Sequence, residues 1–122
     1  MSNYDRVETP IATPDRNSLV LVYYDVQDRS DAERAAYEEP PGSDRDEIRN
    51  LLTSGKLGIV FERDTESVYG GLMLTSQVEN VASAIAAALP HHRMKTRIVM
   101  AYALGGVTPT IQRRLVFTGK GA

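Results

Sequence analysis

The order of the apolar segments is the feature that most constrains how this chain can fold. Read along the sequence, these segments alternate as strand, helix, strand, strand, helix and strand, and one more strand follows near the end. Few windings satisfy that order, because crossover connections between strands of one sheet are right-handed. We therefore predict an α+β domain of the ferredoxin-like βαββαβ type, with an extra C-terminal strand and with both helices on one face of an antiparallel sheet.

The predicted strands are short runs rich in β-branched and aromatic residues, which favour extended structure. Residues 19–24 (LVLVYY) are apolar at every position, a pattern typical of a strand that is buried on both faces. Residues 97–104 alternate between two sets of side chains that are both fairly apolar. The remaining predicted strands are residues 58–63, 67–74 and 113–118.

The predicted helices are marked by their boundary residues. Residues 32–37 indicate a short helix that the Pro-Pro-Gly sequence at 40–42 must stop, because proline cannot continue a helix. Ser43 offers an N-cap for a second helical piece. The best-marked helix begins at residues 76–79, where a Ser-x-x-Glu capping box precedes an apolar stripe, and it ends at Pro90.

The sheet face away from these helices needs a cover of its own. Valine, alanine and tyrosine residues are predicted on both sides of the strands, so this face would expose a large apolar patch in a single chain. A second copy of the chain is the simplest cover. We therefore expect a homodimer in which two sheets pack face to face.

The chain is long enough for one domain, at 122 residues. Residues 1–17 contain two prolines and show no apolar periodicity, so they are predicted to form a flexible N-terminal arm, followed by a single domain over residues 18–122. The absence of cysteine excludes disulfides, thiolate metal sites and a cysteine nucleophile. No apolar run approaches the ~18 residues of a membrane span, and the first residues do not resemble a signal peptide. We expect a soluble, cytoplasmic protein with no membrane partner.

The charges are unevenly divided along the chain. Residues 1–66 hold 8 basic and 15 acidic residues, whereas residues 67–122 hold 6 basic residues and one acidic residue. This division predicts a face for anions, unless folding brings the two halves together. Basic side chains without base-specific partners suit the phosphates of nucleic acid. The candidates are Arg93, Lys95, Arg97, Arg113 and Arg114.

Two of these assignments carry alternatives. Arg97 could instead be a strand-edge charge that prevents aggregation. Arg113 and Arg114 point to opposite faces of a strand, so at most one of them need contact nucleic acid. The adjacent pair His91-His92 is more simply a solvated loop pair than a metal site.

Asp25 is the candidate for chemistry, because a carboxylate at the end of an apolar strand costs free energy unless it has a partner or a role. Position alone favours a turn-forming aspartate that bonds its own backbone. If a dimer brought two such strand ends together, however, the two carboxylates would favour a divalent cation between them.

A resemblance to a known family bears on that choice. Residues 20–26 (VLVYYDV) resemble the opening strand, ending in aspartate, of the small CRISPR-associated adaptation nuclease, the second of the two universal Cas families. Residues 61–63 (FER), followed by 67–69 (SVY) and Gly71, are similar to a block of that family at the same spacing. Further similarity extends over roughly residues 19–119.

The resemblance implies a homodimer that bridges two dimers of the CRISPR integrase and holds duplex DNA by its phosphates. If the protein cleaves nucleic acid, Asp25 of each chain would be the catalytic residue and would hold Mg²⁺, which activates water and stabilises charge on the phosphate. Arg63 and Ser67 would lie near that strand end and contact nucleic acid. The implied cellular role is structural rather than catalytic, and whether the protein is an endonuclease stays open.

Two other functions remain. A VapD-type endoribonuclease toxin is a relative with the same fold and a similar block. The chain could also be a ligand-binding ferredoxin-like dimer with no nucleic-acid function. That alternative needs a pocket lined by Tyr23, Tyr69 and Tyr102, residues that are more often part of a core or an interface.

Overall fold

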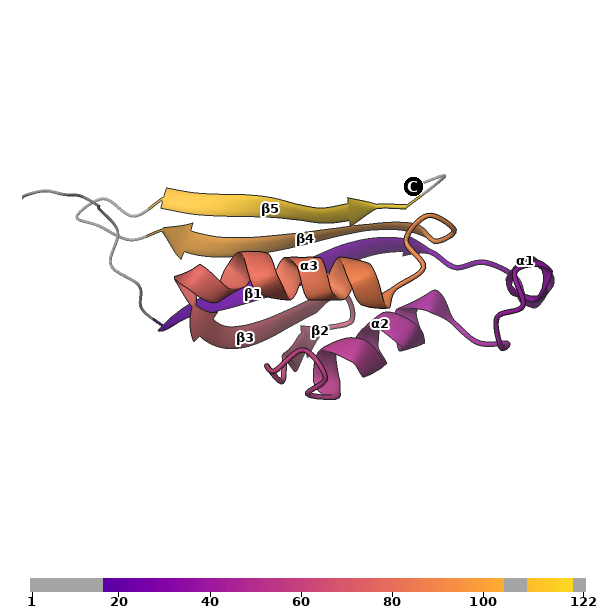
Figure 1. Ribbon diagram of the computed structural model, residues 1–122, viewed down its shortest axis with the longest axis horizontal. Coiled ribbons are helices and arrows are strands. Elements are labelled where there is room, and N and C mark those ends of the chain that lie inside the picture. Colours follow the sequence, from indigo (N-terminus) through magenta and orange to yellow (C-terminus); the bar gives the residue numbers. More distant parts are fainter. Residues whose placement is uncertain (1–16, 105–109, 120–122) are drawn as a thin grey trace, which may run out of the picture.

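The computed structural model describes residues 17–104 and 110–119 and shows an α+β fold built on one antiparallel sheet (Figure 1). The elements, in chain order, are β1 (Asn17–Gln27), α1 (Asp31–Ala36), α2 (Asp44–Thr53), β2 (Glu62–Thr65), β3 (Val68–Leu74), the 3-10 turn η1 (Thr75–Gln77), α3 (Val78–Ala88), β4 (Lys95–Leu104) and β5 (Thr110–Thr118).

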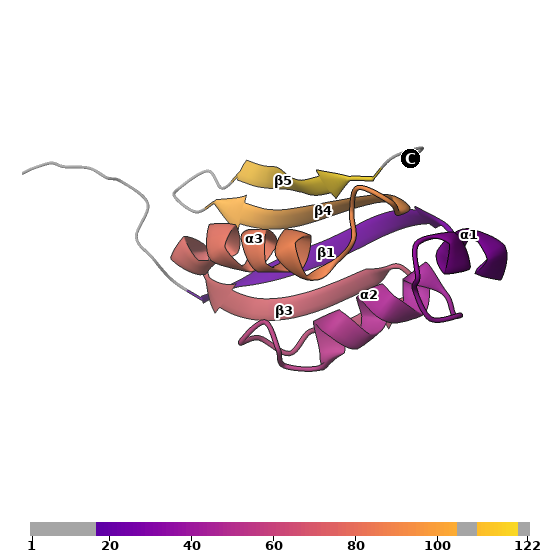
Figure 2. The same cartoon turned by 45° about the vertical axis from the view of Figure 1, so that its right-hand side comes forward.

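The five strands are ordered β2-β3-β1-β4-β5, and every neighbouring pair is antiparallel. The most apolar strand, β1, therefore lies in the middle of the sheet, where it pairs with β3 on one side and β4 on the other. Helices α2 and α3 lie side by side over one face of the sheet (Figures 1 and 2).

The core lies between that face and the two helices. Alternate residues of β1 point into it, so that Val20 and Val22 are fully buried against Ile48 of α2 and Ile85 of α3. The opposite set of β1 residues, beginning with Leu19, faces away from the helices. The prediction that β1 is buried on both faces is therefore wrong for this chain alone, while the expectation of a bare second face is confirmed for the described residues.

This bare surface, which we call the open face, carries large apolar side chains in contact with solvent. They come from β3, from the central strand β1 and from the edge strand β5, and Leu72 is 67% exposed. The register places all of them on the side away from the helices. The exposed set consists of Leu19, Leu72, Leu74, Ile111 and Leu115.

The second predicted strand, residues 58–63, is wrong over most of its length. Residues 58–61 do not join the sheet, and β2 begins only at Glu62. Instead, the backbone N–H of Phe61 donates to the Leu52 carbonyl of α2 at 3.0 Å, and the Phe61 ring is buried in the core. The apolar run at residues 58–61 therefore covers the end of the core beneath α2. A segment that covers a core in this way has the same apolar composition as a buried strand.

The start of α3 also differs from the prediction. The N-cap of α3 is Gln77 rather than Ser76, because the turn η1 precedes the helix. The Gln77 side chain accepts a hydrogen bond from the Leu74 N–H at 2.8 Å. Glu79 pairs with Arg114 of β5 instead of capping the helix.

Two predictions fall partly outside the described residues. The proposed N-terminal arm lies there except for Asn17, which pairs with Leu74 as the first residue of β1. The predicted single domain over residues 18–122 includes residues 105–109 and 120–122, which also lie outside the described residues. In the part of the chain that is described, no helix has both the length and the apolar character to cross a membrane.

The neighbouring glycines of β3 provide a test of this packing. A Cβ on Gly71 would meet the Phe61 ring at 2.8 Å, whereas a Cβ on Gly70 would meet Leu19 at an ordinary 3.4 Å. We expect Gly71→Ala to lower the free energy of unfolding by about 1–3 kcal/mol through overpacking, and Gly70→Ala to change it much less. Urea denaturation of both variants measures the difference, and equal losses would contradict this position of Phe61.

Candidate functional site

The predicted site residues gather mainly at one end of the sheet, which we call the Asp25 end. Because β1 is antiparallel to both neighbours, its carboxyl end meets the amino ends of β3 and β4. The turn before β3 and the start of β4 carry most of the predicted nucleic-acid contacts. The residues placed at this end are Asp25, Arg63, Ser67, Arg93, Lys95 and Arg97.

The turn between β2 and β3 is fastened to β1 through Tyr24. The Tyr24 N–H donates to the Ser67 carbonyl at 3.2 Å, and its hydroxyl donates to the Glu66 carbonyl at 3.2 Å. The Tyr24 ring stacks on Tyr69 with 6.1 Å between centroids. Burial, followed by the hydrogen bond with Tyr69, raises the pKa of Tyr24, so the hydroxyl stays protonated and remains a donor.

Three cations at alternate positions, Arg93, Lys95 and Arg97, form what we call the basic row. Lys95 lies opposite Gln27 in the register of β4 with β1, and Arg97 lies opposite Asp25. Alternation along β4 therefore turns Lys95 and Arg97 toward the open face, on the same side as the Asp25 carboxylate.

Acidic residues from the first half of the chain meet this row. The Lys95 Nζ lies 3.0 Å from a carboxylate oxygen of Glu33 in α1, and the Arg93 Nε lies 3.0 Å from Glu39. Folding thus brings the acidic and basic halves together here, the alternative that the uneven charge distribution left open. The predicted phosphate-binding cations are partly neutralised by the protein itself.

The two arginines of β5 point to opposite faces, as predicted. Arg114 lies on the helix side, where its Nε donates to the Glu79 carboxylate at 2.8 and 3.0 Å. Arg113 lies opposite Ala101 on the open face, and no ion pair joins it to another described residue. Arg63 is exposed on β2, and its Nε donates to the Thr65 carbonyl at 3.4 Å. Their contacts with nucleic acid stay predictions.

Asp25 is exposed and lies within β1, two residues before the strand ends, so it does not form a turn. The interpretation of Asp25 as a turn-forming aspartate is therefore wrong. Among the described residues, Asp25 also belongs to no group of three or more metal-ligating side chains, and its cross-strand neighbour is the cation Arg97. A single chain therefore offers Mg²⁺ one carboxylate here, beside a cation, whereas Mg²⁺ is usually bound through one or two carboxylates together with waters and phosphates.

A buried ion cluster lies beside the Asp25 end, and the sequence reasoning missed it. Asp44 at the start of α2 is fully buried and accepts from Arg29 at 3.0 and 2.9 Å in a bidentate pair. Arg34 of α1 donates to the same carboxylate and to Glu47 at 3.1 Å. Such bidentate pairs join residues 10 to 15 positions apart, so apolar periodicity does not reveal them. The mixture of arginine and acidic residues over 28–47 was the available signal.

The cluster also contains three carboxylates whose oxygens lie within 4.8 Å of one another, close enough to hold a metal ion. Three guanidinium groups already balance their charges, so a cation would have to displace or outcompete an arginine. The carboxylates belong to Glu39, Asp44 and Glu47, and the arginines are Arg29, Arg34 and Arg93. The contacts indicate a structural ion-pair cluster that fastens the α1 segment to α2 and β4.

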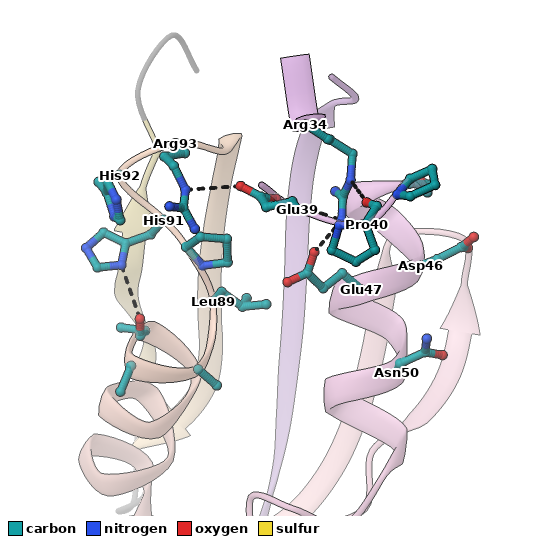
Figure 3. Close-up of a pocket in the computed structure, with 17 residues that line it drawn as sticks. Arg34, Glu39, Pro40, Asp46, Glu47, Asn50, Leu89, His91, His92 and Arg93 are labelled. Atoms are coloured by element: carbon teal, nitrogen blue, oxygen red, sulfur yellow. Dashed lines mark hydrogen bonds and ion pairs between the residues drawn. The ribbon is translucent and has the colours of Figure 1, made fainter. Parts of the chain in front are cut away.

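A cleft of about 780 Å³ lies between α2 and the end of α3 (Figure 3). The ion pair of Arg93 and Glu39 joins its two walls, and Glu47 lines the side of α2. The His91 Nδ1 lies 3.1 Å from the Ala86 carbonyl and its half-buried ring lies beside Phe117, whereas His92 is exposed.

A second cleft, of about 730 Å³, opens on the open face between Leu19, Val60 and Leu72. The tyrosines of the ligand-binding alternative do not line either cleft. Tyr69 is buried on the helix side of the sheet, whereas the register places Tyr23 on the open face. These tyrosines do not converge on one pocket.

Comparison with known proteins adds no family to this geometry: no family model, curated protein or solved structure matches the chain. The chemistry must therefore be argued from the described residues themselves. The Asp25 end combines an exposed carboxylate with a row of cations, whereas most exposed apolar side chains of the open face lie toward the other end of the sheet.

The ion cluster predicts an acid-sensitive stability. Hydrogen bonds from Arg29, with Arg93 and Arg34 nearby, lower the pKa of Glu39 below its ordinary 4.5. The unfolded chain therefore binds a proton first as the pH falls, and the stabilisation is complete above about pH 4.5 and lost below it. We expect Glu39→Gln to be less stable at pH 7 and to lose less stability between pH 5 and pH 3 than the parent. Urea unfolding at each pH gives both slopes, and equal slopes would contradict the cluster's role.

Proposed function

We propose that the chain is a homodimeric CRISPR adaptation subunit that bridges integrase dimers and holds duplex DNA by its phosphate backbone. The observation that carries this proposal is the contact between the two segments of the family resemblance. Tyr24, next to Asp25, is bonded to the turn at Ser67, and Tyr69 stacks on it. The strand order β2-β3-β1-β4 is the order expected of a ferredoxin-like sheet, with β5 as the extra strand.

The open face supports the homodimer. Its exposed leucine and isoleucine side chains form an apolar surface that extends from β3 across β1 to β5. Apolar patches of this kind are covered in functional proteins, and a two-fold axis lets a surface pack on itself. A two-fold axis along the strands would bring the two Asp25 ends near each other at the rim of the interface.

The basic row supports nucleic-acid binding without base readout. Lys95 and Arg97 lie on the open-face side at the Asp25 end, at the rim of the expected interface. Arg113 instead lies between Ile111 and Leu115 on the apolar part of that face. In a dimer, the rows of two copies would together follow a length of phosphate backbone. Contacts of this type position a duplex and contribute affinity that depends on salt rather than on sequence.

The geometry favours binding over cleavage. Among the described residues, Asp25 belongs to no group of three or more metal-ligating side chains, so a Mg²⁺ site with two carboxylates would take Asp25 from both copies. When bound, Mg²⁺ would lower the pKa of a water molecule and stabilise charge on the phosphate. Within one chain, the neighbouring Arg97 opposes a cation at that position.

The dimer is tested by a charge placed on either face of β5. Ile111 is 65% exposed on the open face, and its neighbour Gln112 points to the helix side. We expect light scattering after gel filtration to show a dimer for the parent and for Gln112→Asp, and a monomer for Ile111→Asp, because a carboxylate would be buried at the interface. A monomeric parent, or equal behaviour of the two variants, would overturn the sheet-to-sheet dimer.

Duplex binding is tested on Lys95 and Arg97, with Arg49 of α2 as the control. Arg49 is an exposed cation of α2 that pairs with Asp46, on the face of the sheet opposite to Lys95 and Arg97. We expect Lys95→Ala and Arg97→Ala to weaken binding of duplex DNA and to reduce the slope of log affinity against log salt by ~0.9 for each lost phosphate contact. Fluorescence anisotropy over a salt series measures both quantities. An effect no larger than that of Arg49→Ala would count against this surface.

The same proteins incubated with Mg²⁺ and labelled nucleic acid separate the related functions. Binding of duplex DNA without cleavage is the result expected of a structural subunit. Cleavage of RNA that is lost in Asp25→Asn would instead support the VapD-type ribonuclease. Cleavage of DNA that is lost in the same variant would add a nuclease activity to the proposed function.

A further inference from the structure

We propose that residues 30–39, which we call the acidic flap, are an autoinhibitory cover over the basic row. In this arrangement Glu33 and Glu39 occupy Lys95 and Arg93 in the place of phosphates, and bound nucleic acid displaces them. The inference rests on the proposed function and adds a regulation of that same surface.

The flap is attached to the strands almost entirely through polar contacts. Helix α1 lies beyond the end of β1, apart from the two helices that cover the sheet (Figures 1 and 2). Its one buried residue is Arg34, which belongs to the ion cluster, and no α1 side chain joins the hydrophobic core. At β4 the flap is held by the ion pairs of Glu33 with Lys95 and Glu39 with Arg93.

Tyr37 of the flap adds a third contact, because the Arg93 guanidinium lies 5.4 Å from the centre of its ring. The side chains of Lys95 and Glu33 are 33% and 43% exposed, so water and salt reach their ion pair. Exposed pairs of this kind are weak and are screened by salt. A polyanion with many phosphates can therefore replace them.

The acidic residues keep partners when the flap opens. One Glu33 oxygen accepts from the Ser30 N–H at 2.9 Å in the capping box of α1, so the helix does not depend on Lys95. Glu39 remains bonded to Arg29 at 2.7 and 3.2 Å without Arg93. Arg34 keeps Asp44 and Glu47, so opening separates α1 from Lys95 and Arg93 while α1 stays joined to α2. No buried carboxylate is then left unpaired, and the released cations gain phosphates. An exchange of partners lets one surface alternate between a closed and a DNA-bound state.

The test compares two neutralising substitutions on the same helix. Glu33→Gln removes the carboxylate that faces Lys95, whereas Asp31→Asn removes an equal charge that makes no ion pair with a described residue. We expect Glu33→Gln to bind duplex DNA about 2- to 5-fold more tightly at low salt, the range that corresponds to one exposed ion pair. We expect a smaller gain for Asp31→Asn, and no gain from Glu33→Gln when Lys95→Gln is also present.

A second measurement follows the flap directly. Amide hydrogen exchange of residues 30–39 should become faster when duplex DNA binds, because displacement frees α1 from β4. Slower or unchanged exchange in the complex would overturn the flap inference, as would equal gains in Glu33→Gln and Asp31→Asn or a gain that persists without Lys95. Failure of the parent and of Glu33→Gln to bind any duplex would instead overturn the proposed function itself.

Discussion

The antiparallel pairing of β1 with both β3 and β4 is the constraint on which the rest of the structure depends. It places the most apolar strand at the centre of the sheet and turns one set of its residues, including Val20 and Val22, into the core. It also brings the carboxyl end of β1 to the turn before β3 and to the start of β4. Segments that are about 40 and 70 residues apart in the sequence therefore meet at Asp25.

Much of this fold could be predicted from the sequence, because β1, β3, β4 and β5 are runs whose composition favours strands. Ser43 is the N-cap of α2, as its position suggested. Residues 58–61 were mistaken for a strand because a run that covers the core has the same composition as one that pairs in a sheet. The ion cluster around Asp44 was missed because its partners are brought together only by the path of the chain.

The candidate site, like the fold, could be predicted from the sequence only in part. The resemblance directed attention to Asp25 and Ser67, and the structure places both at one end of the sheet. The sequence could not show that Lys95 and Arg93 are already paired with acidic residues, because the ion pairs depend on where α1 lies. The uneven charge of the chain is therefore expressed as contacts between its halves. A phosphate backbone would have to displace these acidic residues before it could bind Lys95 and Arg93.

The position of the two Asp25 ends in solution tests the central claim most directly. The chain has no cysteine, so Asp25→Cys accepts a single spin label without other changes. If two chains pack through their open faces with the two-fold axis along the strands, the dipolar coupling between labels should give a short and narrow distance distribution. A label on α2 at Asp46→Cys should give a longer distance. Absence of coupling at Asp25, or a shorter distance between the α2 labels, would contradict the sheet-to-sheet arrangement.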